Sequence, residues 1–80
     1  MSTVVGSTNA YAANTAALAT RLERMADQRE GQAVAFGARL CRDRALTPLQ
    51  VADALIPHWA RVQRLRRSAA IAARTARELG

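Results

Sequence analysis

The chain contains no lysine, one cysteine, one histidine and very few aromatic residues among its 80 residues. A single cysteine excludes an internal disulfide and favours a reducing compartment, so we expect a cytoplasmic protein. One cysteine, one histidine and a few scattered acidic residues provide no convergent set for zinc binding or nucleophilic catalysis. We therefore expect no enzyme activity, no catalytic residues, no bound metal, no cofactor and no small-molecule substrate.

Long apolar runs are also missing, and no stretch approaches the ~18 residues that a membrane-spanning helix requires. Residues 10–12 read Ala-Tyr-Ala, which is similar to a signal-peptide cleavage site. No basic residue and no apolar segment precede them, however, as a signal peptide would require. We expect neither a signal peptide nor a membrane partner.

Arginine and alanine are the residues that the chain has in excess. Arginine supplies all 12 basic residues against 6 acidic ones, and the formal net charge is +6. The missing lysine is typical of codon usage in GC-rich genomes, while guanidinium groups also bind phosphate and carboxylate in bidentate fashion. Under either explanation the surplus charge attracts polyanions, so we expect DNA or an acidic protein as the partner.

The alanine content and the absence of alternating β-branched residues predict helices and no strands. Thr47 and Pro48 predict a helix start, as N-cap and first helical residue. Gly31 predicts either the end of the first helix or a bend in it, and Pro57 predicts a break. The expected fold class is all-α, a small bundle of about four helices with a long C-terminal helix. The expected organisation is a flexible arm at 1–8 and one helical domain at 9–80, with helices at 9–29, 32–45, 48–55 and 57–79.

Bulky apolar residues are few, which predicts a thin core and an oligomer, since a lone 80-residue domain is marginally stable. Cys41 is expected to be buried as a small apolar residue. Two stripes at helical spacing are candidates for the core and for a dimer interface. The first is Tyr11, Leu18, Leu22 and Met25, and the second is a heptad-like seam formed by Val62, Leu65, Ala69, Ala72, Ala76 and Leu79.

Residues 39–67 carry a further pattern. Arg39 to Thr47 read RLCRDRALT, the following eight residues read PLQVADAL, and His58 to Leu65 read HWARVQRL. With Ala52 at a helix crossing and Val62 three residues before Leu65, this span resembles the helix-turn-helix of the lambda-repressor-like family. The resemblance implies that the helix expected at 48–55 packs against the one expected at 57–79, and that the outer face of the latter enters the major groove.

The resemblance also implies roles for eight side chains. Those expected to face bases are Trp59, Gln63, Arg64 and Arg67. Those expected to bind phosphates are Arg42, Arg44, Arg61 and Arg66. The implied function is a small DNA-binding transcriptional regulator that acts as a dimer. The alternative is a non-catalytic helical interaction or structural subunit, of phage or plasmid origin, that binds an acidic partner or binds nucleic acid without sequence preference.

Overall fold

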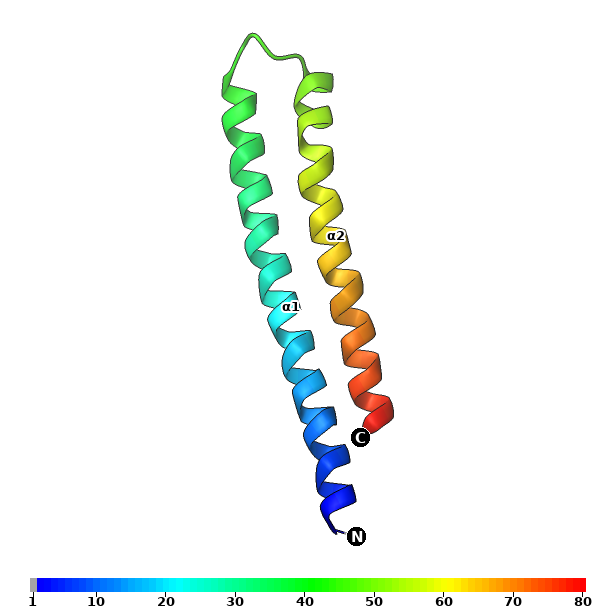
Figure 1. Cartoon of the computed structure of the whole chain (residues 1–80). Helices are drawn as coiled ribbons and strands as arrows, with labels where there is room; N and C mark the ends of the chain where they lie inside the picture. Colours follow the sequence, from blue (N-terminus) through cyan, green and yellow to red (C-terminus); the bar gives the residue numbers. More distant parts are fainter. Residues whose placement is uncertain (1) are drawn as a thin grey trace.

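The computed structural model describes the backbone of residues 2–80 and the side chains of residues 10–80. Two long helices, α1 (Ser2–Arg42) and α2 (Pro48–Leu79), lie side by side in opposite directions and are joined by residues 43–47 (Figure 1). The hairpin is a rod measuring 67 × 15 × 11 Å. Its two ends differ, because α1 extends beyond the C-terminal end of α2.

The expected bundle of about four helices is wrong, since the described chain forms a two-helix hairpin. The segments expected as helices 9–29 and 32–45 belong to α1, except for residues 43–45, which lie in the connection. The segments expected at 48–55 and 57–79 belong to α2. Residues 2–8, expected as an arm, also lie within α1, and Met1 lies outside the described residues.

Neither predicted breaker interrupts its helix, because each lies on an outward side of the hairpin. Gly31 is exposed, and a side chain added there would meet nothing within 4 Å. Pro57 is exposed inside α2. It removes one backbone hydrogen bond at a cost of ~3 kcal/mol. Leu55 before it and His58 after it nevertheless pack against Gly37 and Phe36 of α1. Packing along the hairpin therefore outweighs local helix propensity.

The predicted start of α2 is confirmed. Thr47 has extended backbone angles and its hydroxyl accepts a hydrogen bond from the backbone N–H of Gln50. The Gln50 side chain in turn accepts from the backbone N–H of Thr47 at 2.8 Å, which completes a capping box. Pro48 stands in the first turn, where its missing N–H costs nothing.

The core is a seam of small side chains between the helices. On α1 the buried residues Ala19, Ala26 and Ala33 recur every seven positions. On α2 the buried residues are Val51, Val62, Ala69 and Ala72. A seven-residue repeat keeps one narrow stripe of each helix facing the other, as in an antiparallel coiled coil, and alanine allows close approach.

Two expectations about burial are wrong for this hairpin, the burial of Leu18 and Met25 in the core and the burial of Cys41. Leu18 and Met25 are exposed by 46% and 45%, because the neighbouring alanines occupy the seam instead. The seam of α2 packs against α1 of the same chain, and the use of either stripe as a dimer interface stays a prediction. Cys41, expected to be buried, is exposed.

Candidate functional site: a basic groove

The structure disperses the eight side chains that sequence analysis assigned to DNA. Arg42 ends α1, Arg44 lies in the connection, and the other six lie along α2. The turn that a helix-turn-helix requires between Leu55 and His58 is not formed, because α2 is continuous there. DNA binding by these residues therefore stays a prediction.

His58 and Trp59 lie in the first half of α2, and both are half-buried. The imidazole ring of His58 packs on the Phe36 ring of α1, with 4.8 Å between ring centroids. The guanidinium of Arg39 lies 5.9 Å from the centroid of the same Phe36 ring. These aromatic contacts join the two helices near the connection. Gln63, Arg64 and Arg67 are exposed.

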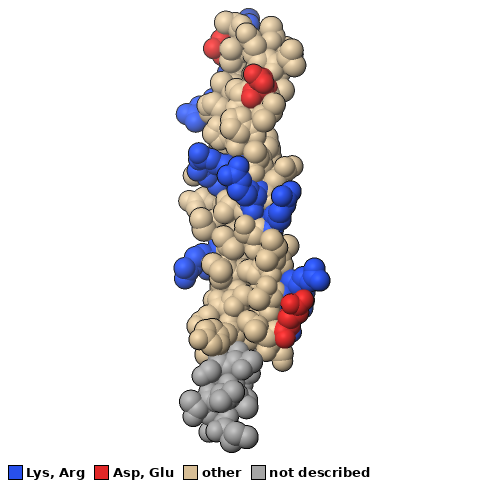
Figure 2. Space-filling view, turned by 45° about the vertical axis from the view of Figure 1, so that its right-hand side comes forward, with Lys and Arg blue, Asp and Glu red and all other residues tan. Residues whose placement is uncertain are grey.

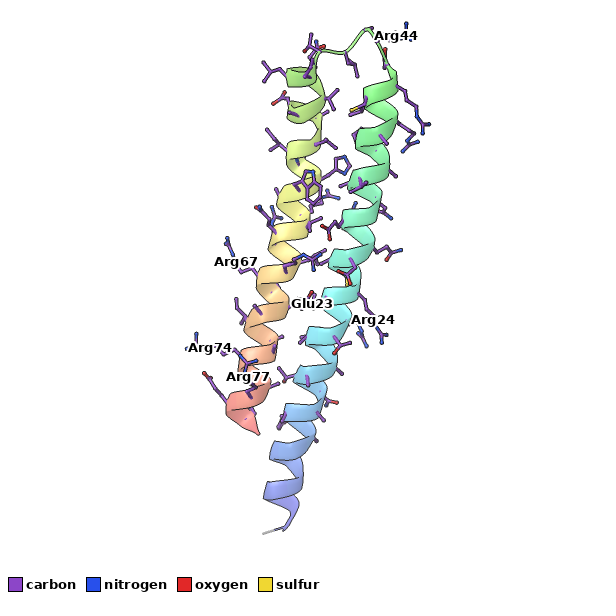
Figure 3. All side chains as sticks on the ribbon, turned by 180° about the vertical axis from the view of Figure 1, so that it is seen from behind. Glu23, Arg24, Arg44, Arg67, Arg74 and Arg77 are labelled. Atoms are coloured by element: carbon purple, nitrogen blue, oxygen red, sulfur yellow. The ribbon has the colours of Figure 1, made fainter. Side chains whose placement is uncertain are left out.

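Arg66 is held within the hairpin. Its guanidinium donates hydrogen bonds to Glu23 at 2.9 Å, to Asp27 at 3.1 Å and to Glu30, all on α1. The hydrogen bonds to Asp27 and Glu30 raise the pKa of Arg66, so it stays protonated. Figure 3 shows Glu23 on the side of α1 that faces α2, whereas Arg24 and Arg67 point away from the partner helix. Half of the acidic residues are thus gathered around Arg66, on one flank of the hairpin.

The basic groove lies on the other flank, where two helices meet in an open hollow. It is lined by Met25, Arg29, Arg61, Arg64, Leu65 and Ser68. No carboxylate lines it. Among residues whose side chains are described, only Arg66 and Arg74 form ion pairs. The three groove arginines therefore bring unneutralised positive charge to one place.

Apolar side chains continue the groove toward the open end of the hairpin. Leu18 precedes Met25 by seven residues, and Ile71 follows Arg64 by seven, so each lies two helical turns further along the same line. Ile71 is 60% exposed. Figure 2 shows basic side chains gathered across the middle of the hairpin, with no acidic side chain among them. The face is therefore both strongly basic and apolar.

Sequence analysis found Arg61 and Arg64 but missed Arg29 and Met25 as members of the same site. The signal was present as a seven-residue repeat of Tyr11, Leu18 and Met25 beside the alanine repeat. Because the larger residues were assigned to the core, the alanines were not recognised as the inner stripe. The antiparallel pairing that brings Arg29 to Arg61 depends on the hairpin.

No helix in the described part of the chain is long and apolar enough to cross a membrane. Comparison of the chain with protein-family models, curated proteins and solved structures finds no match in any of the three. Function is therefore inferred from the geometry of the hairpin.

Proposed function

We propose that this chain is a non-catalytic helical interaction protein that binds an acidic helix of another protein along the basic groove. The observation that carries the proposal is the make-up of the groove: Arg29, Arg61 and Arg64 surround the apolar side chains of Met25 and Leu65. Guanidinium groups pair with carboxylates in bidentate fashion, and an amphipathic helix supplies the matching apolar stripe. Action in the cytoplasm belongs to the same proposal.

The apolar extension of the groove favours a protein over a nucleic acid. Exposed aliphatic side chains such as Leu18 and Ile71 lose surface to water when a third helix packs beside the hairpin. Phosphate groups would use only the arginines and would leave these side chains exposed. A partner helix that places carboxylates opposite Arg61 and Arg64 would contact both the arginines of the groove and the apolar side chains beside them.

DNA is the competing partner. Gln63, Arg64 and Arg67 are exposed on α2, and a formal charge of +6 attracts any polyanion. Regulation of transcription through base contacts by these residues remains the second proposal. Under it, the apolar side chains of the groove should contribute nothing to binding.

The test is a titration of the full chain at two salt concentrations with two probes. One probe is a synthetic helix with leucine at two positions per heptad and flanking glutamates, and the other is random-sequence duplex DNA. The variants are the double substitution Arg61→Glu with Arg64→Glu, and Ile71→Ser. The control for charge reversal is Arg24→Glu, which makes half of this charge change on a side of α1 that points away from α2.

We expect the double substitution to weaken peptide binding at least tenfold, which is ~1.4 kcal/mol, and Ile71→Ser to weaken it by less. Arg24→Glu should change it little. If DNA binds more tightly than the peptide, and Ile71→Ser leaves DNA binding unchanged, the nucleic-acid proposal replaces this one.

A further inference from the structure

A second exposed surface lies on the flank opposite the basic groove, near the connection between the helices. This uncharged patch consists of Val34, Cys41, Leu49, Ala52, Ile56 and Trp59. Leu49, Ile56 and Val34 are exposed by 79%, 61% and 58%. Trp59 is half-buried, and Cys41 and Ala52 line one shared hollow. A cluster of large exposed aliphatic side chains is typical of a protein interface.

The helical repeat places these residues on the same flank as the Arg66 cluster. Trp59 and Ala52 precede Arg66 by seven and fourteen residues, so they continue its line along α2 toward the connection. Ile56 lies three residues before Trp59 and is its neighbour on the helix surface, and Leu49 stands in the same relation to Ala52.

On α1 the corresponding line runs from Glu30, which bonds Arg66, to Gly37. Val34 and Cys41 stand three residues before and four after Gly37, which makes both its neighbours on the helix surface. The side chain of Leu55 packs against Gly37 from α2. Both helices therefore contribute to one continuous surface. No member of it carries a charge, and Asp53 lies at its edge, four residues after Leu49 and three before Ile56.

The charge distribution points to a second copy of this chain as the occupant. Every copy carries +6, so contact through the basic groove would bring two sets of arginines together. The uncharged patch is free of this repulsion. A twofold contact sets the same apolar patch against itself, so that each aliphatic side chain meets an aliphatic surface.

The elongated hairpin exposes more surface than a compact chain of the same mass. The chain exposes 6198 Å² of surface, whereas a compact protein of 8.6 kDa exposes ~4,700 Å². The difference of about 1,500 Å² is spread over the whole rod, and a stable interface of standard size uses ~800 Å² from each partner. One self-contact therefore leaves surface for a further partner.

We propose that the uncharged patch joins two copies of this chain about a twofold axis, with Leu49, Ile56 and Trp59 at the centre of the contact. This inference is independent of the partner proposed for the groove. Because the two surfaces lie on opposite flanks, the dimer carries two free basic grooves and is bivalent.

Sedimentation equilibrium of the full chain at micromolar concentration tests the proposal with two matched variants. Ile56→Asp places a charge in the uncharged patch, and Ile71→Asp places the same charge at a side chain of nearly equal exposure, 61% against 60%, on the other flank. We expect the unsubstituted chain and Ile71→Asp to be dimers. Ile56→Asp should dissociate at least ten times more readily, with its helical circular dichroism retained.

A monomeric unsubstituted chain overturns the proposal, as does a dimer that Ile71→Asp breaks and Ile56→Asp does not. Alkylation of Cys41 by iodoacetamide gives a second readout that needs no substitution. The thiol should react more slowly as the chain concentration is raised through the dimerisation range. A rate independent of concentration in a chain that is dimeric by sedimentation would place the interface elsewhere. Neither outcome depends on whether the groove binds an acidic helix.

Discussion

Arg66 of α2 donates a 2.9 Å hydrogen bond to Glu23 of α1, a residue 43 positions earlier in the chain. The same guanidinium contacts Asp27 and Glu30, so one arginine holds together three carboxylates that would otherwise repel one another. The cluster fixes the alignment of the two helices in the middle of the hairpin, where the seam itself consists largely of alanine.

Replacing this arginine should lower the thermal unfolding midpoint. Arg66→Gln removes three ion pairs and leaves three like charges close together, so the loss should be largest at low salt and should shrink in molar salt. The control is Arg74→Gln, which removes a single pair with Glu78 inside one helix. Equal losses for the two variants would contradict a cross-hairpin role.

The loss caused by Arg66→Gln should not vary between neutral pH and pH ~9. The pKa of Arg66 is raised above its already strongly alkaline ordinary value. A raised pKa contributes stability that is fully present below the unfolded pKa and is lost only as the pH rises through the folded one. Thermal scans of both proteins at the two pH values check this.

Ala26 is 0% exposed in the seam, so a larger side chain there should force the helices apart. Ala26→Leu should lower the free energy of unfolding by ~1–3 kcal/mol, measured by urea titration. Ala17→Leu is the matched control, because Ala17 is an exposed alanine of the same helix, and we expect its effect to lie within ~0.5 kcal/mol of zero. A seam that accepted leucine without loss would contradict close helix packing.

The two glycines inside α1 should respond differently to alanine. Gly31→Ala meets open space and should stabilise the hairpin by ~0.5–1 kcal/mol through helix propensity. At Gly37 the new Cβ would lie 3.2 Å from a terminal methyl carbon of Leu55, which must shift to make room. Gly37→Ala should therefore gain less or lose stability, and equal gains in urea titration would refute this contact.

Removing the cap of α2 should destabilise the hairpin. Thr47→Ala deletes the hydroxyl that accepts from Gln50 and should cost ~1 kcal/mol of unfolding free energy. Thr75→Ala is the control, because its hydroxyl donates to the Ile71 carbonyl inside α2, a backbone oxygen that remains paired within the helix. A larger loss from the control would show that the cap does not position α2.

Some features of this protein depended on the sequence alone. The all-helical composition is determined by alanine content, and the start of α2 is determined locally, because Thr47, Pro48 and Gln50 satisfy the first backbone groups of the helix among themselves. The surplus of arginine is likewise a property of the composition. The helix start rests on interactions between residues a few positions apart, and the other two features rest on composition.

The tertiary structure decided the number of helices and the position of the groove. Gly31 and Pro57 are local breakers, yet both helices continue through them, because packing along the seam on either side outweighs the local cost. Whether Ala26 or Met25 faces inward is a choice between adjacent stripes, and close approach to α2 selects the smaller side chain. Arg29 and Arg61 are 32 positions apart and meet only when the chain folds back on itself.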